Sequence, residues 1–138
     1  KLFEDQAIRK SITLKLEPLS TNPKVLIDED RMIQALSNLL NNAIDYSPEG
    51  SQVLLRLSET NTEVIFEIID SGPGIDPSEL PYIFERFHRA DRSRQKSDSH
   101  SGLGLAIAKA IITAHQGNIS AQTVLGQGTK IQIRLAKH

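Results

Sequence analysis

Polar side chains recur at helical spacing in the segment NLLNNAIDYSPEG, which starts at Asn38. Asn38, Asn42 and Asp45 share one side of a helix expected over residues 28–46. The apolar side chains are expected on the opposite side: Ile33, Leu36, Leu40, Ala43 and Ile44. A solvated face would explain the polar residues, but three asparagines cost a helix roughly 2 kcal/mol relative to alanine. An amide oxygen can also ligate Mg²⁺ beside ligand phosphates. The helix alone leaves both interpretations open.

A carboxylate at the end of an apolar strand is the second feature that could do chemistry. In IIDSGPGI, Asp70 continues the strand face that carries Phe66 and Ile68. The strand therefore directs a carboxylate toward the apolar layer, where an unpaired charge is costly. Asp70 could cap its own turn, as Asp often does, or it could accept a hydrogen bond from an N–H group of a ligand. Gly72 and Gly74 form a tight turn whose backbone can approach a flat ligand closely.

Two further glycine pairs are weaker signals for phosphate binding. In HSGLGLAIAK, Gly102 and Gly104 open a helix whose free N–H groups could bind phosphate, although glycine near a helix start is common. The turn LGQGTK at 125–130, taken in isolation, is best interpreted as an ordinary hairpin turn. Between the first two glycine turns lies a basic loop, of which at least one cation is expected to reach phosphate. Its cations are Arg86, Arg89, Arg92, Arg94 and Lys96.

Composition narrows the classes of function. The 138 residues suit one domain, and 16 basic against 17 acidic residues provide no field to attract nucleic acid or an anionic membrane surface. The absence of cysteine excludes disulfides and thiolate metal sites. No apolar run is long enough to span a bilayer. The chain opens with KLFEDQAIRKS, so residues 1–10 are assigned to the end of a preceding helix or a linker, and residues 11–138 to the domain.

The hydrophobic pattern predicts an α+β fold. Strands are expected at 12–17, 24–28, 52–59, 62–70, 118–124 and 129–136. Helices are expected at 28–46 and 102–117, with a short helical piece at 79–87 and a loop at 88–101. Most strands have one apolar and one polar face, so the sheet should be covered on one side only. The expected fold is a two-layer sandwich, in which about three helices cover a mixed, mainly antiparallel sheet of about five strands.

The order of the motifs resembles the catalytic, ATP-binding domain of sensor histidine kinases. NLLNNAIDYS is similar to that family's N box, DSGPGI to its first glycine box, and IFERFHR to its F box. SGLGLAIAK is similar to its second glycine box and GQGT to its last glycine turn. The resemblance extends from about Ile12 to Leu135. It implies the Bergerat ATP-binding fold, which DNA gyrase, heat-shock chaperone and mismatch-repair ATPases share.

The resemblance implies a role for each matched residue. Asn42 would ligate the Mg²⁺ that bridges the ATP phosphates, and Asn38 would lie near those phosphates. Asp70 would accept a hydrogen bond from the adenine amino group, a contact worth roughly 1.5–3 kcal/mol. The other implied contacts are Tyr46, Gly72, Gly74 and Ile75 at the base, Phe84 and Phe87 at the base of the lid, Arg89, Ser101, Gly102, Leu103, Gly104 and Leu105 at the phosphates, and Thr129 at the far side of the pocket. No catalytic residue is assigned apart from the phosphate contact of Arg89.

Two positions depart from the family pattern. Family members often carry a cation that contacts phosphate where Asp45 stands, so an acid there could weaken nucleotide binding. His100 stands where a further glycine often precedes the second glycine box, and it is interpreted as a plain loop histidine.

The function implied by the resemblance is transfer of the γ-phosphoryl group of Mg-ATP to a histidine on a separate dimerisation domain, with a response regulator downstream. Such transfer depends on positioning and charge neutralisation. The four histidines of the chain lack the acidic residue and Thr-Pro or Asn-Pro that usually follow the acceptor. The domain alone is therefore expected to bind Mg-ATP without phosphorylating itself. It is also expected to be monomeric, with no nucleic-acid partner. A cytoplasmic location is expected, whether or not the parent protein is anchored in a membrane.

Other classes of function remain open. An ATP-hydrolysing clamp of the gyrase or chaperone type would need a Glu as general base, and Asn38 occupies that position. A serine-directed kinase of the anti-sigma type is a further alternative. A non-catalytic nucleotide-binding regulatory module would follow if Asp45 prevents catalysis.

Overall fold

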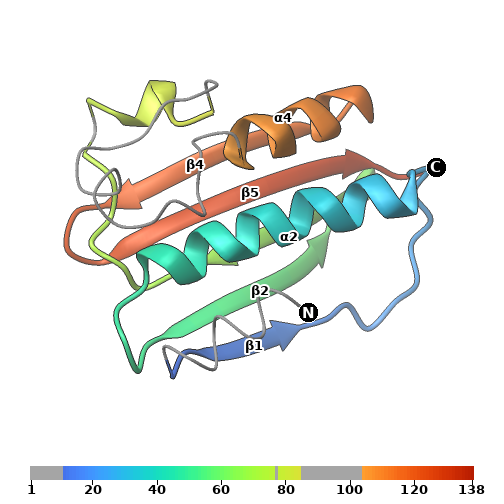
Figure 1. Ribbon diagram of the computed structural model, residues 1–138. Coiled ribbons are helices and arrows are strands. Elements are labelled where there is room, and N and C mark those ends of the chain that lie inside the picture. The colour runs from blue at the N-terminus through green and yellow to red at the C-terminus, as the bar shows by residue number, and fades with distance from the viewer. Residues whose placement is uncertain (1–10, 77, 85–103) are drawn as a thin grey trace.

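A five-stranded sheet, with the strand order β1-β2-β3-β5-β4, forms the base of the structure (Figure 1). The computed structural model describes residues 11–76, 78–84 and 104–138. The elements in these ranges are β1 (Thr13–Glu17), α2 (Glu29–Tyr46), β2 (Gln52–Glu59), β3 (Glu63–Ile69), the 3₁₀ helix η1 (Leu80–Tyr82), α4 (Gly104–Ala114), β4 (Asn118–Val124) and β5 (Gly128–Ala136). Pairing is parallel between β1 and β2 and antiparallel elsewhere, which confirms the predicted mixed, mainly antiparallel sheet.

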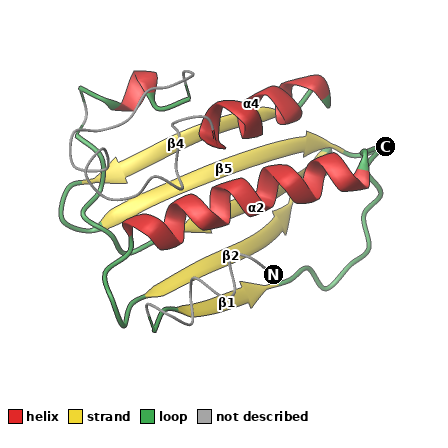
Figure 2. Cartoon of the chain, viewed as in Figure 1, coloured by secondary structure: helices red, strands yellow, loops and turns green. Residues whose placement is uncertain are grey.

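Two α-helices, α2 and α4, cover the same face of the sheet in the described ranges (Figure 2). The prediction of about three helices is therefore wrong for this part of the chain. The predicted piece at 79–87 forms only the single turn η1 where it is described, with a proline in its first positions. Neither described helix is long and apolar enough to cross a membrane.

Helix α2 begins and ends where the sequence predicts. The Asp28 side chain caps it by accepting a hydrogen bond from the Arg31 backbone N–H at 3.2 Å. Ser47, before Pro48, is the C-cap. The predicted helix phase, however, is slightly wrong, because Ile33 is 56% exposed. The buried side runs through Met32, Ala35, Leu39, Leu40, Ala43 and Ile44. The polar side chains of this helix therefore flank the core instead of lying opposite to it.

The segment predicted as a strand at 24–28 is not a strand in the structure. Leu26 is 76% exposed, whereas Val25 packs against the core. Within the described ranges, two backbone hydrogen bonds from outside reach this segment, and neither comes from a paired strand. The His138 N–H donates to the Lys24 carbonyl at 2.7 Å, and the Met32 N–H in the first turn of α2 donates to the Asp28 carbonyl at 2.9 Å. Without a neighbouring strand to pair with, its apolar residues do not produce a strand.

Helix α4 ends three residues before the predicted Gly117. Gln116 adopts the left-handed conformation, with φ 60°, and Gly117 donates its N–H to the Ile112 carbonyl at 2.9 Å. A Cβ on Gly117 would lie 2.8 Å from the Arg134 carbonyl oxygen. The glycine is therefore required by close packing against β5.

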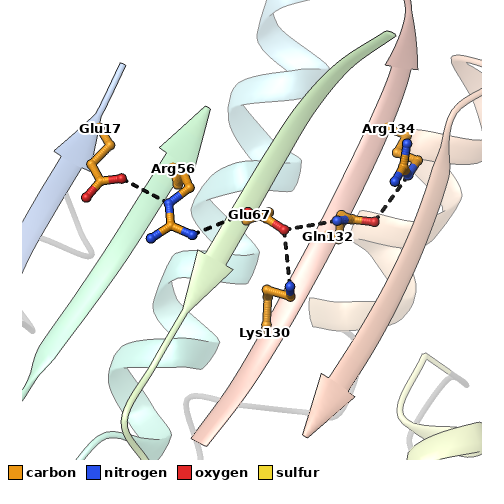
Figure 3. Close-up of polar contacts among 6 residues, drawn as sticks. All are labelled: Glu17, Arg56, Glu67, Lys130, Gln132 and Arg134. Carbon is orange, nitrogen blue, oxygen red and sulfur yellow. Dashed lines mark hydrogen bonds and ion pairs between the residues drawn. The ribbon is translucent and has the colours of Figure 1, made fainter. Parts of the chain in front are cut away.

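The open face of the sheet carries a polar network across the strands (Figure 3). Glu67 on β3 lies at its centre and is only 9% exposed. Its carboxylate accepts a hydrogen bond from Gln132 at 3.0 Å and forms ion pairs with Lys130 at 3.3 Å and Arg56 at 3.8 Å. Although burial alone would raise it, these contacts hold the pKa of Glu67 below its usual value. The network thus ties β2, β3 and β5 in register.

We expect Glu67→Gln to lower the free energy of unfolding by about 1 kcal/mol at pH 7, a value that allows for the solvent around Arg56 and Lys130. Because the pKa of Glu67 is lowered on folding, its contribution is full above the ordinary glutamate pKa and is lost as the pH falls through the folded value. The difference between variant and wild type in urea unfolding should therefore shrink in acid. Glu63→Gln, on the same strand, is the control, because its ion pair with Arg134 is more exposed. An equal effect of the two substitutions would contradict the central role of Glu67.

Candidate nucleotide-binding site

A pocket lies between α2, the start of α4 and the adjoining ends of β3 and β5. Seven of the residues singled out in the sequence line it, namely Asn42, Tyr46, Asp70, Gly74, Ile75, Leu105 and Thr129. The other lining residues are Leu39, Ala43, Ile68, Ile83 and Ile131. The polar groups therefore converge on a space whose walls are mainly aliphatic, as is usual for small-molecule sites.

The pocket is narrow in this state. Its volume is about 20 Å³, which is room for a single water molecule. A flat ring could enter only if the pocket widens.

Asp70 lies where β3 leaves the sheet, as the strand pattern predicts. Its backbone N–H donates to the Thr129 carbonyl at 3.0 Å, which extends the β3–β5 ladder by one step. Its side-chain Oδ1 accepts hydrogen bonds from the N–H groups of Gly72 at 2.9 Å and Thr129 at 3.2 Å. Burial raises the pKa of Asp70, and these two hydrogen bonds only partly offset that effect.

The two sequence interpretations of Asp70 do not exclude each other. Oδ1 caps the turn at Gly72. Among the residues that the structure describes, Oδ2 has no hydrogen-bond partner, although Asp70 lines the pocket. A half-buried carboxylate whose second oxygen has no partner in the described residues can accept a hydrogen bond from an N–H donor in the pocket.

Glycines allow the loops around Asp70 to pack closer than any other residue would permit. A Cβ on Gly128, which has φ +133°, would lie 2.1 Å from the Asp70 carbonyl oxygen. A Cβ on Gly72 would lie 2.6 Å from the carbonyl oxygen of Tyr46 at the end of α2. The turn at 125–130 was interpreted in isolation as an ordinary hairpin turn. In the structure it also forms part of the support for Asp70.

The amide side chains of α2 take two different positions. Asn42 lines the pocket, whereas Asn38 does not. The Asn38 side chain donates a hydrogen bond from Nδ2 to the Gly104 carbonyl at 3.4 Å, which links α2 to the first residue of α4. Gly104 does not line the pocket, but its neighbour Leu105 does.

A metal ion could bind in this pocket only if a bound ligand supplied further coordinating atoms. The described residues contain no group of three or more His, Cys, Asp or Glu side chains that could hold a metal ion. Asn42 supplies a single neutral oxygen, and this fits Mg²⁺ only if phosphate oxygens and water complete its coordination.

Several predicted residues lie outside the described residues. They are Phe87, Arg89, the other cations of the basic loop, His100, Ser101, Gly102 and Leu103, together with the helix or linker at 1–10. Phe84 is described and is half-buried, with the Lys109 ammonium 5.9 Å from the centre of its ring. Asp45 is half-buried on α2 and does not line the pocket.

Sequence reasoning missed Thr123, whose hydroxyl binds the backbone of the first glycine turn. Its Oγ1 accepts a hydrogen bond from the Ile75 N–H at 2.7 Å. The alternation of β4, on which Ile119 and Ala121 face the core, could have placed Thr123 on the inner face. Asp70 was found from the same kind of alternation on β3.

Comparison with known proteins identifies the class. The chain belongs to the family of histidine kinase-, DNA gyrase B- and HSP90-like ATPases, whose pattern it matches over residues 27–138. Within that family, its relatives define it as an ATP-binding catalytic domain of the sensor histidine kinase type. The resemblance inferred from the order of the motifs is thereby confirmed.

Three relatives illustrate this likeness. Sensor protein SrrB of Staphylococcus aureus is 41% identical over 110 residues, which are 80% of this chain and 19% of that protein. The mycobacterial sensor histidine kinase MprB has a TM-score of 0.84 at 33% identity, over 98% of this chain and 90% of that one. Full-length ShkA in complex with AMPPNP has a TM-score of 0.80 at 31% identity, over 99% of this chain and 28% of that one. The chain thus spans about a fifth of the length of SrrB.

We expect Asp70→Asn to raise the free energy of unfolding of the ligand-free domain at pH 7. The substitution removes a desolvated charge, while the Asn oxygen can still accept the N–H groups of Gly72 and Thr129. Because folding raises the pKa of Asp70, the ionised carboxylate opposes folding above the folded pKa, and the penalty vanishes below the unfolded pKa. Thermal unfolding across pH 3–8 should show the gain growing as the pH rises. A loss of stability at pH 7 would contradict the assignment.

We expect Gly128→Ala and Gly126→Ala to have very different effects. Both glycines have positive φ, so each substitution carries a backbone cost of about 1–2 kcal/mol. Only Gly128 has a neighbour within reach of the new methyl group, the Asp70 carbonyl, whereas Gly126 faces open space. Gly128→Ala should therefore cost about 3 kcal/mol or more in urea unfolding. Equal costs would show that the close approach of these two loops is not required.

Proposed function

We propose that this domain binds Mg-ATP in the pocket at Asp70 and donates the γ-phosphoryl group to a histidine on a separate dimerisation domain of the same protein. The observation that carries the proposal is Oδ2 of Asp70, which lines a mainly aliphatic pocket and has no hydrogen-bond partner among residues 11–76, 78–84 and 104–138. The amino group of adenine supplies the N–H donor that this oxygen lacks. Tyr46, Gly74, Ile75 and Thr129 would surround the base.

The phosphates would extend from the base along α2 toward the start of α4. Asn42 would hold the metal ion, and Asn38 would keep the two helices together through Gly104. The first N–H groups of a helix such as α4 lack partners within the helix and favour phosphate. Bound Mg²⁺ would neutralise phosphate charge. Arg89 and residues 101–103 are proposed as further phosphate contacts.

Transfer to another molecule is favoured over hydrolysis. A hydrolase needs a base to take a proton from water, and the neutral amide of Asn38 cannot do so. Its Nδ2 is also engaged with the Gly104 carbonyl. The gyrase-type clamp is therefore not supported by this site.

The relatives support the proposed partners. SrrB is a sensor protein and MprB a sensor histidine kinase. This chain covers only a fifth of the length of SrrB, which leaves room in a parent protein for a phosphoacceptor domain. We propose that a response regulator receives the phosphoryl group from that domain.

The test is transfer of labelled phosphate from Mg-ATP, with and without the dimerisation domain of the parent protein. We expect acid-labile label on the dimerisation domain and none on this chain alone. Asn42→Ala should lower the rate at limiting Mg²⁺ by about tenfold or more, a loss that excess Mg²⁺ partly restores. Asn41→Ala is the matched control, because Asn41 does not line the pocket.

Two results would contradict the proposal. One is acid-labile label on the isolated chain, and the other is steady release of phosphate by the chain alone.

A further inference from the structure

Thr123, near the end of β4, connects two loops that line the nucleotide pocket but does not line the pocket itself. Its Oγ1 accepts the Ile75 N–H at 2.7 Å, lies 3.1 Å from the Gly128 carbonyl oxygen and lies 3.2 Å from Oγ1 of Thr129. The hydroxyl thus contacts the first glycine turn on one side and the last glycine turn on the other.

These contacts complete a ring of hydrogen bonds at the rim of the pocket. Asp70 Oδ1 accepts the Thr129 N–H, Thr129 Oγ1 contacts Thr123 Oγ1, and Thr123 accepts the N–H of Ile75. The chain itself closes the ring from Ile75 back to Asp70. A further backbone hydrogen bond, from Gly126 to the Pro73 carbonyl at 2.7 Å, joins the same two turns outside the ring.

The hydroxyl group of Thr123 has a single proton, and its direction determines whether the Thr129 hydroxyl can donate a hydrogen bond into the pocket. A hydroxyl donates one hydrogen bond, so Thr123 donates either to the Gly128 carbonyl or to Thr129. If it donates to Thr129, the proton of Thr129 is available to an acceptor in the pocket. If it donates to Gly128, Thr129 can donate to Thr123 and presents only lone pairs to the pocket.

We infer that Thr123 is a positioning residue for recognition of the base: its hydroxyl fixes Ile75 and orients the Thr129 hydroxyl beside Asp70, without touching the nucleotide. The inference rests on the proposed binding of adenine in this pocket. Adenine presents a donor beside a ring acceptor, whereas guanine presents the reverse. When Thr123 donates to Thr129, the Thr129 hydroxyl can donate its own proton to the ring acceptor of adenine, while the Asp70 carboxylate accepts from the amino group. This arrangement favours adenine over guanine.

The test compares Thr123→Val, which keeps the shape but removes the hydroxyl, with Thr123→Ser, which keeps the hydroxyl. We expect Thr123→Val to bind ADP about tenfold more weakly, to lose a similar factor for adenosine, and to discriminate less between ADP and GDP. Thr123→Ser should restore both affinity and discrimination. Thr13→Val, on the exposed side of β1, is the matched control and should bind like the wild type.

The readouts separate positioning from mere support of the fold. Affinities are measured well below the melting temperature, and a general loss of stability would leave the ratio of ADP to GDP affinity unchanged. An unchanged ratio in Thr123→Val, or no recovery in Thr123→Ser, would overturn the inference. Failure of the wild-type domain to bind ADP would instead overturn the proposed function, and the inference with it.

A measurement on the wild-type domain covers the case in which Thr123→Val does not fold. The Ile75 amide should exchange with solvent at least tenfold more slowly than the amide of Asn61, in the exposed β2–β3 turn. Equal exchange rates would show that the Thr123 hydroxyl does not hold Ile75, and the inference would fail.

Discussion

The site depends on a half-buried carboxylate, Asp70, at the point where β3 leaves the sheet. Burial makes the charge of Asp70 costly, and two backbone N–H groups, from Gly72 and Thr129, offset part of that cost through one oxygen. The loops can bring these N–H groups close only because glycine stands at 72 and 128. The ligand-free domain thus loses stability by keeping a carboxylate in the lining of the pocket, a common relation between stability and function at binding sites.

Strands β3 and β5 hold pocket residues on one face of the sheet and the polar network at Glu67 on the other. Lys130 directly follows Thr129, and its ammonium binds Glu67 on the open face (Figure 3). The register that pairs Ile69 with Lys130 also places Asp70 beside Thr129. A shift of one residue between these strands would exchange the two faces, so the network at Glu67 helps to determine what the pocket contains.

Much of this could be predicted from the sequence because it depends on local pattern. Alternation on β3 placed Asp70 on the inner face, and Asp28 and the Ser-Pro pair bounded α2 correctly. The order of the motifs identified the family. Other features depend on residues distant in sequence. The phase of α2 was slightly wrong because packing against the sheet and α4 exposes Ile33. The segment expected as a strand at 24–28 is not paired with any strand in the described ranges. The close approach of Gly128 to Asp70 depends on two positions that are far apart in the chain. The hydrogen bond between Ile75 and Thr123 spans 48 residues.

The most direct test of the account is a crystal structure of the domain with Mg²⁺ and a non-hydrolysable ATP analogue. The account predicts the adenine amino group within hydrogen-bonding distance of Asp70 Oδ2, with the pocket widened and the metal ion bound to Asn42. A base bound elsewhere on the domain, or one that turns a different edge toward Asp70, would contradict it.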